Sequence, residues 1–152
     1  MTTLAQRYLD LCHNRPIPQL IIDTDPGQDD AAAIFMALGL EKMGLAKVLA
    51  LTTVAGNVSL NLTSKNARVI SDWAERSDLP VFAGADKPLL KPLLMAKDGH
   101  GNSGLGELQL HKPHTALQDQ HAAIYLTEVL KKAESYSTTI CAKGPLTNIA
   151  HL

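Results

Sequence analysis

Short apolar segments alternate with longer segments of helical periodicity along most of this chain. Four apolar runs have the length and the β-branched content of buried strands: residues 19–23, 47–54, 79–83 and 138–142. Between them, residues 29–43, 60–75 and 120–133 repeat apolar side chains every three or four positions, which predicts helices. Buried strands joined by helical crossovers are typical of a parallel sheet with helices on both faces. The alternation therefore predicts an α/β fold with a mostly parallel sheet.

Three other segments depart from this rhythm. Residues 2–13 are expected to form a short helix that the following prolines end. Residues 84–119 are rich in glycine and proline, and a loop of this length is often functional. A last helix is expected over residues 144–152, because a proline in second position suits a first helical turn.

The composition excludes several classes of protein. The chain has 152 residues, of which 45% are hydrophobic, and this suits one globular domain. A formal net charge of −1 provides no basic field for nucleic acid or an anionic membrane. No apolar run approaches the ~18 residues of a membrane-spanning helix, and the N-terminal segment is too charged for a signal peptide. Cys12 and Cys141 indicate neither a disulfide framework nor a zinc site, and they fit a cytoplasmic protein.

An unusual density of acidic residues follows the first expected strand, in the segment D-T-D-P-G-Q-D-D. Asp23 and Asp25 are two positions apart and can point to one side of the strand end, while Asp29 and Asp30 fall at the start of the next helix. Open α/β sheets bind ligands at the carboxyl ends of their strands. Carboxylates crowded in this way repel one another and take up protons unless a cation joins them. The cluster therefore predicts a divalent cation with oxygen ligands, Ca²⁺ or Mg²⁺.

Two other interpretations of this segment remain open. Asp29 or Gln28 can cap the helix while the remaining carboxylates are solvated turn residues, although few structural needs require so many like charges. A strand that ends in D-x-D also resembles the nucleophile loop of magnesium-dependent haloacid-dehalogenase-type phosphatases. That pattern usually continues with glycine and threonine, whereas Pro26, Gly27 and Gln28 follow here.

Four stretches resemble the inosine–uridine-preferring nucleoside hydrolases, in the order in which that family has them. D-T-D-P-G-Q-D-D-A is similar to the N-terminal signature, and T-T-V-A-G-N-V to the loop after the second strand. H-G-N-S-G-L-G is similar to an H-G-x-x-G-L-G loop, and G-P-L-T-N-I-A to a segment of the same sequence. The resemblance spans residues 19–152 and implies the Rossmann-like sheet of that family, in truncated form.

The resemblance also implies an activity, a cofactor and a site. Members of the family hydrolyse purine or pyrimidine ribonucleosides to ribose and free base with a water activated by a tightly held Ca²⁺, in nucleoside catabolism and salvage. By motif position, the metal ligands are Asp25, which is also the general base, Asp30 and the backbone carbonyl of Lys143. The substrate-binding residues are Asp29, Asn57 and His100, and Asp23 has a supporting role. Carboxylates of this kind stabilise the positive charge that develops on the sugar during glycosidic cleavage.

Two departures from the family pattern shape these expectations. Lys143 stands where relatives often have an apolar residue or threonine, and its ammonium weakens cation binding unless it points away. Members are also much longer than this chain, so residues 1–152 are expected to be the N-terminal part of a single nucleoside hydrolase domain that lacks its C-terminal half. We therefore expect little or no hydrolase activity from the chain alone, weak Ca²⁺ binding and self-association, with a longer parent that forms dimers or tetramers. The non-enzymatic alternative is a remnant that binds nucleoside or a partner subunit without turnover.

Three other histidines lie between His100, which belongs to the third of these motifs, and the last expected strand. His111, His114 and His121 have a spacing that fits no strong metal-ligand template, so the sequence predicts solvated loop side chains.

Overall fold

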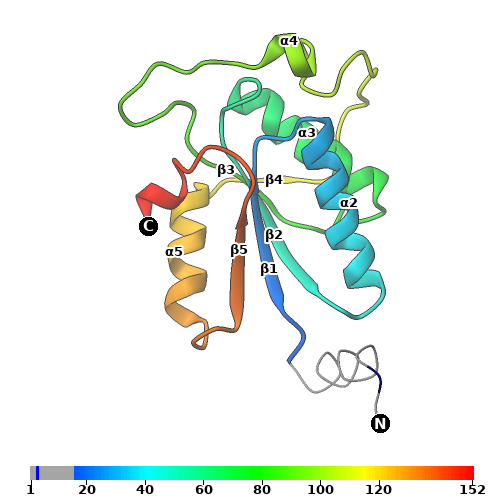
Figure 1. Cartoon of the computed structure of the whole chain (residues 1–152), viewed down its shortest axis with the longest axis vertical. Coiled ribbons are helices and arrows are strands. Elements are labelled where there is room, and N and C mark those ends of the chain that lie inside the picture. Colours follow the sequence, from blue (N-terminus) through cyan, green and yellow to red (C-terminus); the bar gives the residue numbers. More distant parts are fainter. Residues whose placement is uncertain (1–2, 4–15) are drawn as a thin grey trace.

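Five parallel strands form one sheet in the order β4-β3-β2-β1-β5, which confirms the α/β class and the parallel sheet (Figure 1). The computed structural model describes Thr3 and residues 16–152, so Cys12 and the helix expected at residues 2–13 lie outside the described residues. The strands are β1 (Gln19–Thr24), β2 (Lys47–Thr53), β3 (Val81–Ala83), β4 (Leu117–Gln118) and β5 (Thr138–Ala142). Within the described part of the chain, no helix is both long and apolar enough to cross a membrane.

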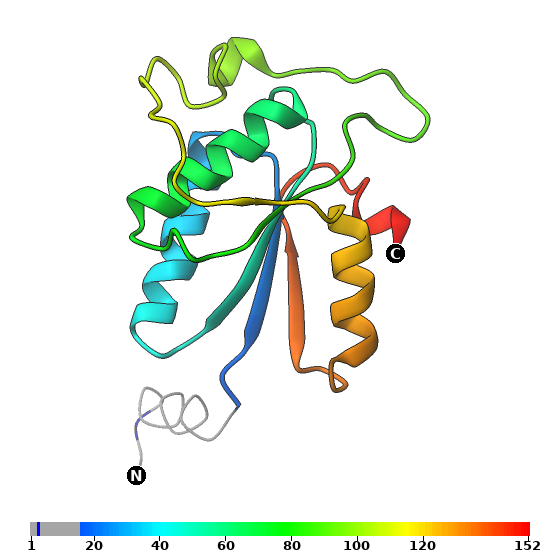
Figure 2. The ribbon, with the colours of Figure 1, turned by 180° about the vertical axis from the view of Figure 1, so that it is seen from behind.

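Helices cover both faces of the sheet, as Figures 1 and 2 show from opposite sides. The long helices are α2 (Gln28–Lys42) and α3 (Leu60–Trp73) on one face and α5 (Ala122–Lys132) on the other. Leu51 and Val81 belong to the larger hydrophobic core, which α2 and α3 complete. Their neighbours Ala50 and Phe82 point the other way and form a smaller cluster with Ala122 of α5. Apolar side chains on both faces explain why the strands are continuously apolar.

The strand order reverses at β1. From β1 the chain proceeds outward through β2 and β3 to β4, and then crosses the sheet so that β5 pairs with the free side of β1. In open α/β sheets, ligands bind in the crevice that forms at the carboxyl ends of the strands where such a reversal occurs. Among the described strands β5 pairs with β1 alone, so it lies at an edge of the sheet, and the expected self-association stays a prediction.

Two expectations about local structure are wrong. The segment 84–119 is not one long loop, because it contains the short helix α4 (Lys97–His100) and β4, which adds a fifth strand. A two-residue strand is too short to show any periodicity in sequence. The helix expected at residues 144–152 is reduced to a 3₁₀ turn, η1 (Ile149–His151), because so short a segment forms few helical hydrogen bonds, among them the one from Ala150 N–H to the Leu146 carbonyl oxygen at 2.9 Å.

Candidate active site

The acidic segment follows β1, at the reversal of the strand order. β1 lies between β2 and β5, so its carboxyl end is flanked by the segments that follow both neighbours. Asp23 pairs with Ala142 at the end of β5, and the backbone N–H of Lys143 donates to the Asp23 carbonyl oxygen at 2.7 Å. The fold thus brings residues from distant parts of the sequence, among them the expected carbonyl ligand, to one end of the sheet.

Asp25 lies one residue beyond β1 and is only 5% exposed. Its Oδ2 accepts a hydrogen bond from the backbone N–H of Asn57 at 2.7 Å, and its carbonyl oxygen accepts one from Asn57 Nδ2 at 3.0 Å. Asn57 therefore holds both the side chain and the backbone of Asp25 against the loop that follows β2. A buried carboxylate in a fixed orientation suits a metal ligand or a general base.

Two glycines leave the space that the Asp25 carboxylate occupies. A Cβ atom at Gly56 would overlap Asp25 Oδ2, and a Cβ atom at Gly144 would lie 2.6 Å from Asp25 Oδ1. Neither glycine has a positive φ, so turn geometry does not require them. Gly56 follows β2 and Gly144 follows β5, so each neighbour of β1 leaves room for one oxygen of the same carboxylate.

Asp29 and Asp30 share the first turn of α2 but differ in their surroundings. Asp30 is 3% exposed, and its Oδ2 accepts a hydrogen bond from the backbone N–H of Gly27 at 3.2 Å. Gly27 is the N-cap of α2, so the interpretation of Asp29 or Gln28 as the cap is wrong. Asp29 is exposed and remains available to a ligand. The second oxygen of Asp30, Oδ1, has no hydrogen-bond partner among the described residues.

Asp23 lies beneath these groups and is fully buried. Its Oδ1 accepts hydrogen bonds from Thr52 Oγ1 at 2.6 Å and from Asn148 Nδ2 at 2.7 Å. Asn148 also donates to the carbonyl oxygen of Thr53 at 3.0 Å and accepts from the backbone N–H of Ala85 at 2.8 Å. Asp23 therefore ties the ends of β1 and β2 to the segment after β5, a position that suits a supporting role.

His100 approaches the acidic segment from the long connection between β3 and β4, which passes over the carboxyl ends of the strands in Figures 1 and 2. His100 Nδ1 lies 2.6 Å from Gln28 Oε1, at the first residue of α2. A Cβ atom at Gly27 would meet His100 Nδ1 at 2.6 Å and Asn57 Nδ2 at 3.1 Å. Both side chains therefore lie against Gly27, beside the acidic residues of the turn.

Burial raises the pKa of three of these carboxyl groups. For Asp25, burial is the largest cause, the hydrogen bond from the Asn57 N–H opposes it, and the result is a pKa of about 6. The negative charges of Asp30 and Asp29 raise the pKa of Asp25 further. Burial is also the main reason why the pKa values of Asp23 and Asp30 are raised. Crowded and buried carboxylates thus hold protons more tightly than in water, as the sequence predicts for a site without its cation.

The raised pKa of Asp25 predicts that the cation-free chain loses stability as the pH rises from about 4 to about 7. The pKa of Asp25 in the folded chain lies above the model-peptide value of 3.8, so a proton on Asp25 stabilises the folded state. This stabilisation is complete below pH 3.8 and is lost as the pH rises through about 6. The full difference between the two pKa values corresponds to about 3 kcal/mol. We expect the free energy of unfolding to fall by roughly 1–2 kcal/mol, because solvent screens part of the effect.

Urea unfolding in the presence of a chelator, repeated across this pH range, measures the effect. Asp25→Asn should reduce the slope of the free energy of unfolding against pH. Asp78→Asn is the matched control, because Asp78 is exposed and its pKa is lowered by Arg76, which places its own titration below this range. A slope that Asp25→Asn leaves unchanged would contradict the prediction.

The donor set at this end of the sheet suits a hard divalent cation. Two buried carboxylate oxygens, Asp23 Oδ2 and Asp30 Oδ1, have no hydrogen-bond partner among the described residues, and an unpaired buried charge is costly. Oxygen ligands of this kind select Ca²⁺ or Mg²⁺ over softer metals. In the described part of the chain, the acidic segment does not bring three carboxylate oxygens within 4.8 Å of one another. Backbone or solvent oxygens therefore have to complete a coordination shell.

Lys143 affects the electrostatics of this site. Its side chain is exposed, and its positive charge lowers the pKa of Asp30, although burial of Asp30 has the larger, opposite effect. The ammonium is therefore close enough to act on the acidic site, and it reduces the attraction for a bound cation.

Sequence reasoning missed the role of Asn66. This residue is fully buried in α3, and its Nδ2 donates to the carbonyl oxygens of Pro26 at 3.1 Å and Ser103 at 2.8 Å. Asn66 thereby ties the acidic turn to the segment that carries His100. The available signal was a polar residue next to Ala67 on the apolar face of a helix, since buried polar side chains usually have a partner to satisfy.

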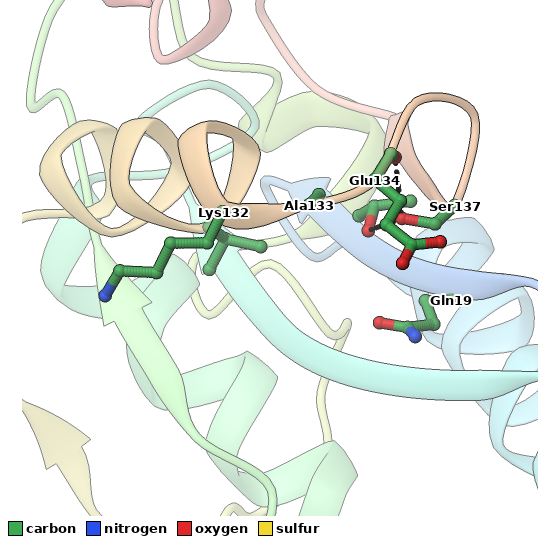
Figure 3. A pocket seen from close by; sticks show the side chains of 7 residues that line it. Gln19, Lys132, Ala133, Glu134 and Ser137 are labelled. Atoms are coloured by element: carbon green, nitrogen blue, oxygen red, sulfur yellow. Dashed lines mark hydrogen bonds between the residues drawn. The ribbon is translucent and has the colours of Figure 1, made fainter.

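A separate hollow of about 520 Å³ lies at the opposite end of the sheet. Figure 3 shows the residues that line it, among them Gln19, Lys132, Glu134 and Ser137. Gln19 begins β1 and Ser137 precedes β5, so the hollow lies at the amino ends of the strands. Because ligands of open α/β sheets bind at the carboxyl ends, we assign no role to this hollow.

Comparison with known sequences agrees with the motifs. Residues 20–152 match the family described as inosine-uridine preferring nucleoside hydrolase. The chain is 40% identical to an inosine-uridine preferring nucleoside hydrolase of Leishmania major over 134 residues, which cover 87% of this chain and 41% of the relative. It is 42% identical to uridine nucleosidase 1 of Arabidopsis thaliana over 135 residues, which cover 87% of this chain and 38% of the relative.

Comparison with solved structures extends this likeness to the fold. A plant nucleoside hydrolase, the PpNRh1 enzyme, superposes with a TM-score of 0.80 at 39% identity, over 89% of this chain and 42% of that protein. The chain thus spans about two fifths of the length of these relatives.

Proposed function

Because the chain belongs to the inosine-uridine preferring nucleoside hydrolase family, we propose that it supplies the acidic part of an active site that cleaves ribonucleosides to ribose and free base. The observation that carries this proposal is the buried Asp25 carboxylate, which the hydrogen bonds from Asn57 hold in one orientation at the carboxyl end of β1. We propose a purine or pyrimidine ribonucleoside as substrate, in nucleoside catabolism or salvage in the cytoplasm, and a homo-oligomeric state for the active enzyme.

We propose Ca²⁺ as the cofactor, held by the carboxylates of Asp25 and Asp30 and the backbone carbonyl of Lys143. The unpartnered Asp30 Oδ1 and the all-oxygen donor set support this choice of a hard cation. When bound, Ca²⁺ lowers the pKa of a water molecule and orients it.

The side chains of the chain have separate tasks in the proposed reaction. Asp25 accepts the proton of the attacking water, and the hydrogen bonds from Asn57 hold it in place for that transfer. Asp29, exposed at the start of α2, accepts hydrogen bonds from ribose hydroxyls. As the glycosidic bond breaks, positive charge develops on the sugar, and the nearby carboxylates stabilise it. His100, in the connection between β3 and β4, covers one side of the site and contacts the substrate.

A hybrid enzyme tests the proposal. In it, residues 20–152 of this chain replace the matching residues of the Leishmania major relative. We expect the hybrid to release base from inosine or uridine in the presence of Ca²⁺ and to lose this activity on chelation. A folded hybrid that binds nucleoside without releasing base would support the non-catalytic alternative, and release of phosphate from a phosphate ester would support the phosphatase alternative.

By contrast, the 152-residue chain alone is expected to release base far more slowly than the full-length Leishmania major relative, and to bind Ca²⁺ more weakly. The reason is that more than half of that relative lies outside the matched region. Chromatographic measurement of released base at equal molar concentrations compares the two proteins. Turnover of inosine or uridine at the rate of the relative would contradict this expectation.

A further inference from the structure

A second group of metal-ligating side chains lies at the C-terminal end of α3. Its centre is Asp72, whose side chain is 5% exposed. Asp72 Oδ1 accepts hydrogen bonds from Thr115 N at 2.9 Å, Thr115 Oγ1 at 2.6 Å and Ser77 Oγ at 2.8 Å. Asp72 Oδ2 accepts a hydrogen bond from the backbone N–H of His114 at 2.7 Å. The carboxylate is thus buried and oriented, with one side of Oδ2 left for a further partner.

Two imidazoles meet on that side of Oδ2. His111 Nε2 lies 3.0 Å and His114 Nδ1 lies 3.6 Å from Asp72 Oδ2. The three ligand atoms all lie within 4.8 Å of one another, and no other group of three His, Cys, Asp or Glu side chains in the described ranges does so. The expectation of a solvated loop side chain holds for His114, which is exposed, whereas His111 is partly buried against Asp72.

These distances are close to those that a tetrahedral zinc ion imposes. Bond lengths of about 2.0–2.2 Å to nitrogen and oxygen place neighbouring ligand atoms about 3.3–3.6 Å apart. The separation of 3.0 Å is slightly shorter than that range, the separation of 3.6 Å lies at its upper limit, and the two imidazole nitrogens lie within 4.8 Å of each other, so small side-chain movements suffice to bind an ion. We propose that Asp72, His111 and His114 form a binding site for Zn²⁺, distinct from the acidic segment after β1.

The surroundings of Asp72 support this assignment. Burial alone raises the pKa of Asp72, but the hydrogen bonds to its oxygens outweigh burial and hold the pKa well below its usual range. Zn²⁺ takes the place of the proton that His111 shares with Asp72, while Thr115 and Ser77 keep the carboxylate oriented. The side chain of His114 is 80% exposed, so the ion is reached from solvent and a water molecule completes the four ligands.

The site joins elements that are distant in sequence. Asp72 belongs to α3, whereas the two histidines precede β4, at the end of the long connection that also carries His100. A bound ion therefore fastens this connection to α3, and it stabilises the folded chain more as the free Zn²⁺ concentration rises above the dissociation constant. The inference does not depend on the proposed function.

The one tryptophan of the chain provides a direct readout. The ring centroids of Trp73 and His111 are 6.1 Å apart, so Co²⁺ in this site quenches the fluorescence of Trp73. We expect the 152-residue chain, with excess Ca²⁺ to occupy the acidic segment, to bind one Zn²⁺ by calorimetry. Stoichiometric Co²⁺ should quench Trp73 and give visible ligand-field bands, and Zn²⁺ should raise the melting temperature.

Histidine variants separate this site from others. His114→Gln and His111→Gln should each lower Zn²⁺ affinity by at least ~10-fold, since even the loss of an outer-sphere partner has an effect of that size. His121→Asn is the matched control, because His121 caps α5 through Nδ1 and asparagine keeps an acceptor there. Because His114 is exposed, its replacement should leave the circular dichroism spectrum unchanged. Failure of Zn²⁺ to bind the chain, or equal affinity of the His114→Gln and His121→Asn variants, would overturn the proposal.

Discussion

Replacing Asp25 by Asn in the hybrid enzyme is expected to reduce the rate of base release by about 10²- to 10⁴-fold, the usual contribution of a general base. The amide has the same shape but cannot accept a proton from water. One of its two positions can still accept the hydrogen bond that Asn57 N–H donates to Asp25 Oδ2, so the fold should persist. The substitution also removes a charge from the proposed cation site, so Ca²⁺ affinity should fall as well.

The measurement is the initial rate of base release from inosine and uridine at saturating Ca²⁺, with circular dichroism as a check on folding. Asp78→Asn is the matched control, because this carboxylate is exposed and pairs with Arg76, away from the acidic segment. We expect that control to keep the unmodified rate. An Asp25→Asn hybrid that is folded and as active as the Asp78→Asn hybrid would exclude Asp25 as the base.

Replacing Gly56 by Ala is expected to lower the same rate by about 10²-fold, without removing any functional group. The added Cβ atom would overlap Asp25 Oδ2 and lie 2.9 Å from Pro145 Cδ, so the carboxylate has to move. A displacement of about 1 Å at a reacting group has an effect of this size. Gly144→Ala tests the opposite side of the carboxylate, since its Cβ would lie 2.6 Å from Asp25 Oδ1.

The control for these variants is Gly39→Ala. Gly39 lies within α2, where an added Cβ atom meets nothing within 4 Å. Alanine is also the better helix former by about 0.5–1 kcal/mol, so this variant should be at least as stable as the unmodified hybrid and equally active. If Gly56→Ala behaves like Gly39→Ala in rate, the position of the Asp25 carboxylate is not limiting.

The fold class was predictable because it depends on patterns that are local in sequence. Continuous apolar runs and helical periodicity correctly placed four strands and three helices, with differences of a few residues at their ends. The wrong predictions concern segments that are too short to show a periodic pattern. β4 is two residues long, and the segment from Gly144 is too short for a stable α-helix, so it forms only the 3₁₀ turn η1.

The acidic residues of the site were also visible in the sequence, but the hydrogen-bond partners of each residue were not. The resemblance to the nucleoside hydrolase family implied that Asp25, Asp30 and His100 belong to one site. The sequence did not show that one oxygen of Asp30 accepts a hydrogen bond from the backbone N–H of Gly27. Nor did it show that Asn66 joins the acidic turn to the segment of His100. Such roles depend on contacts between residues far apart in the chain.

The sequence by itself thus determined the order of the four longer strands and the three long helices, the acidity of the turn after β1 and the family. The tertiary structure decided which strand borders β1 on each side, which oxygens lack a partner, and that Asp72 meets His111 and His114. The physical reason is that periodicity and charge are properties of neighbouring residues, whereas desolvation and ligand geometry arise only when distant segments pack together.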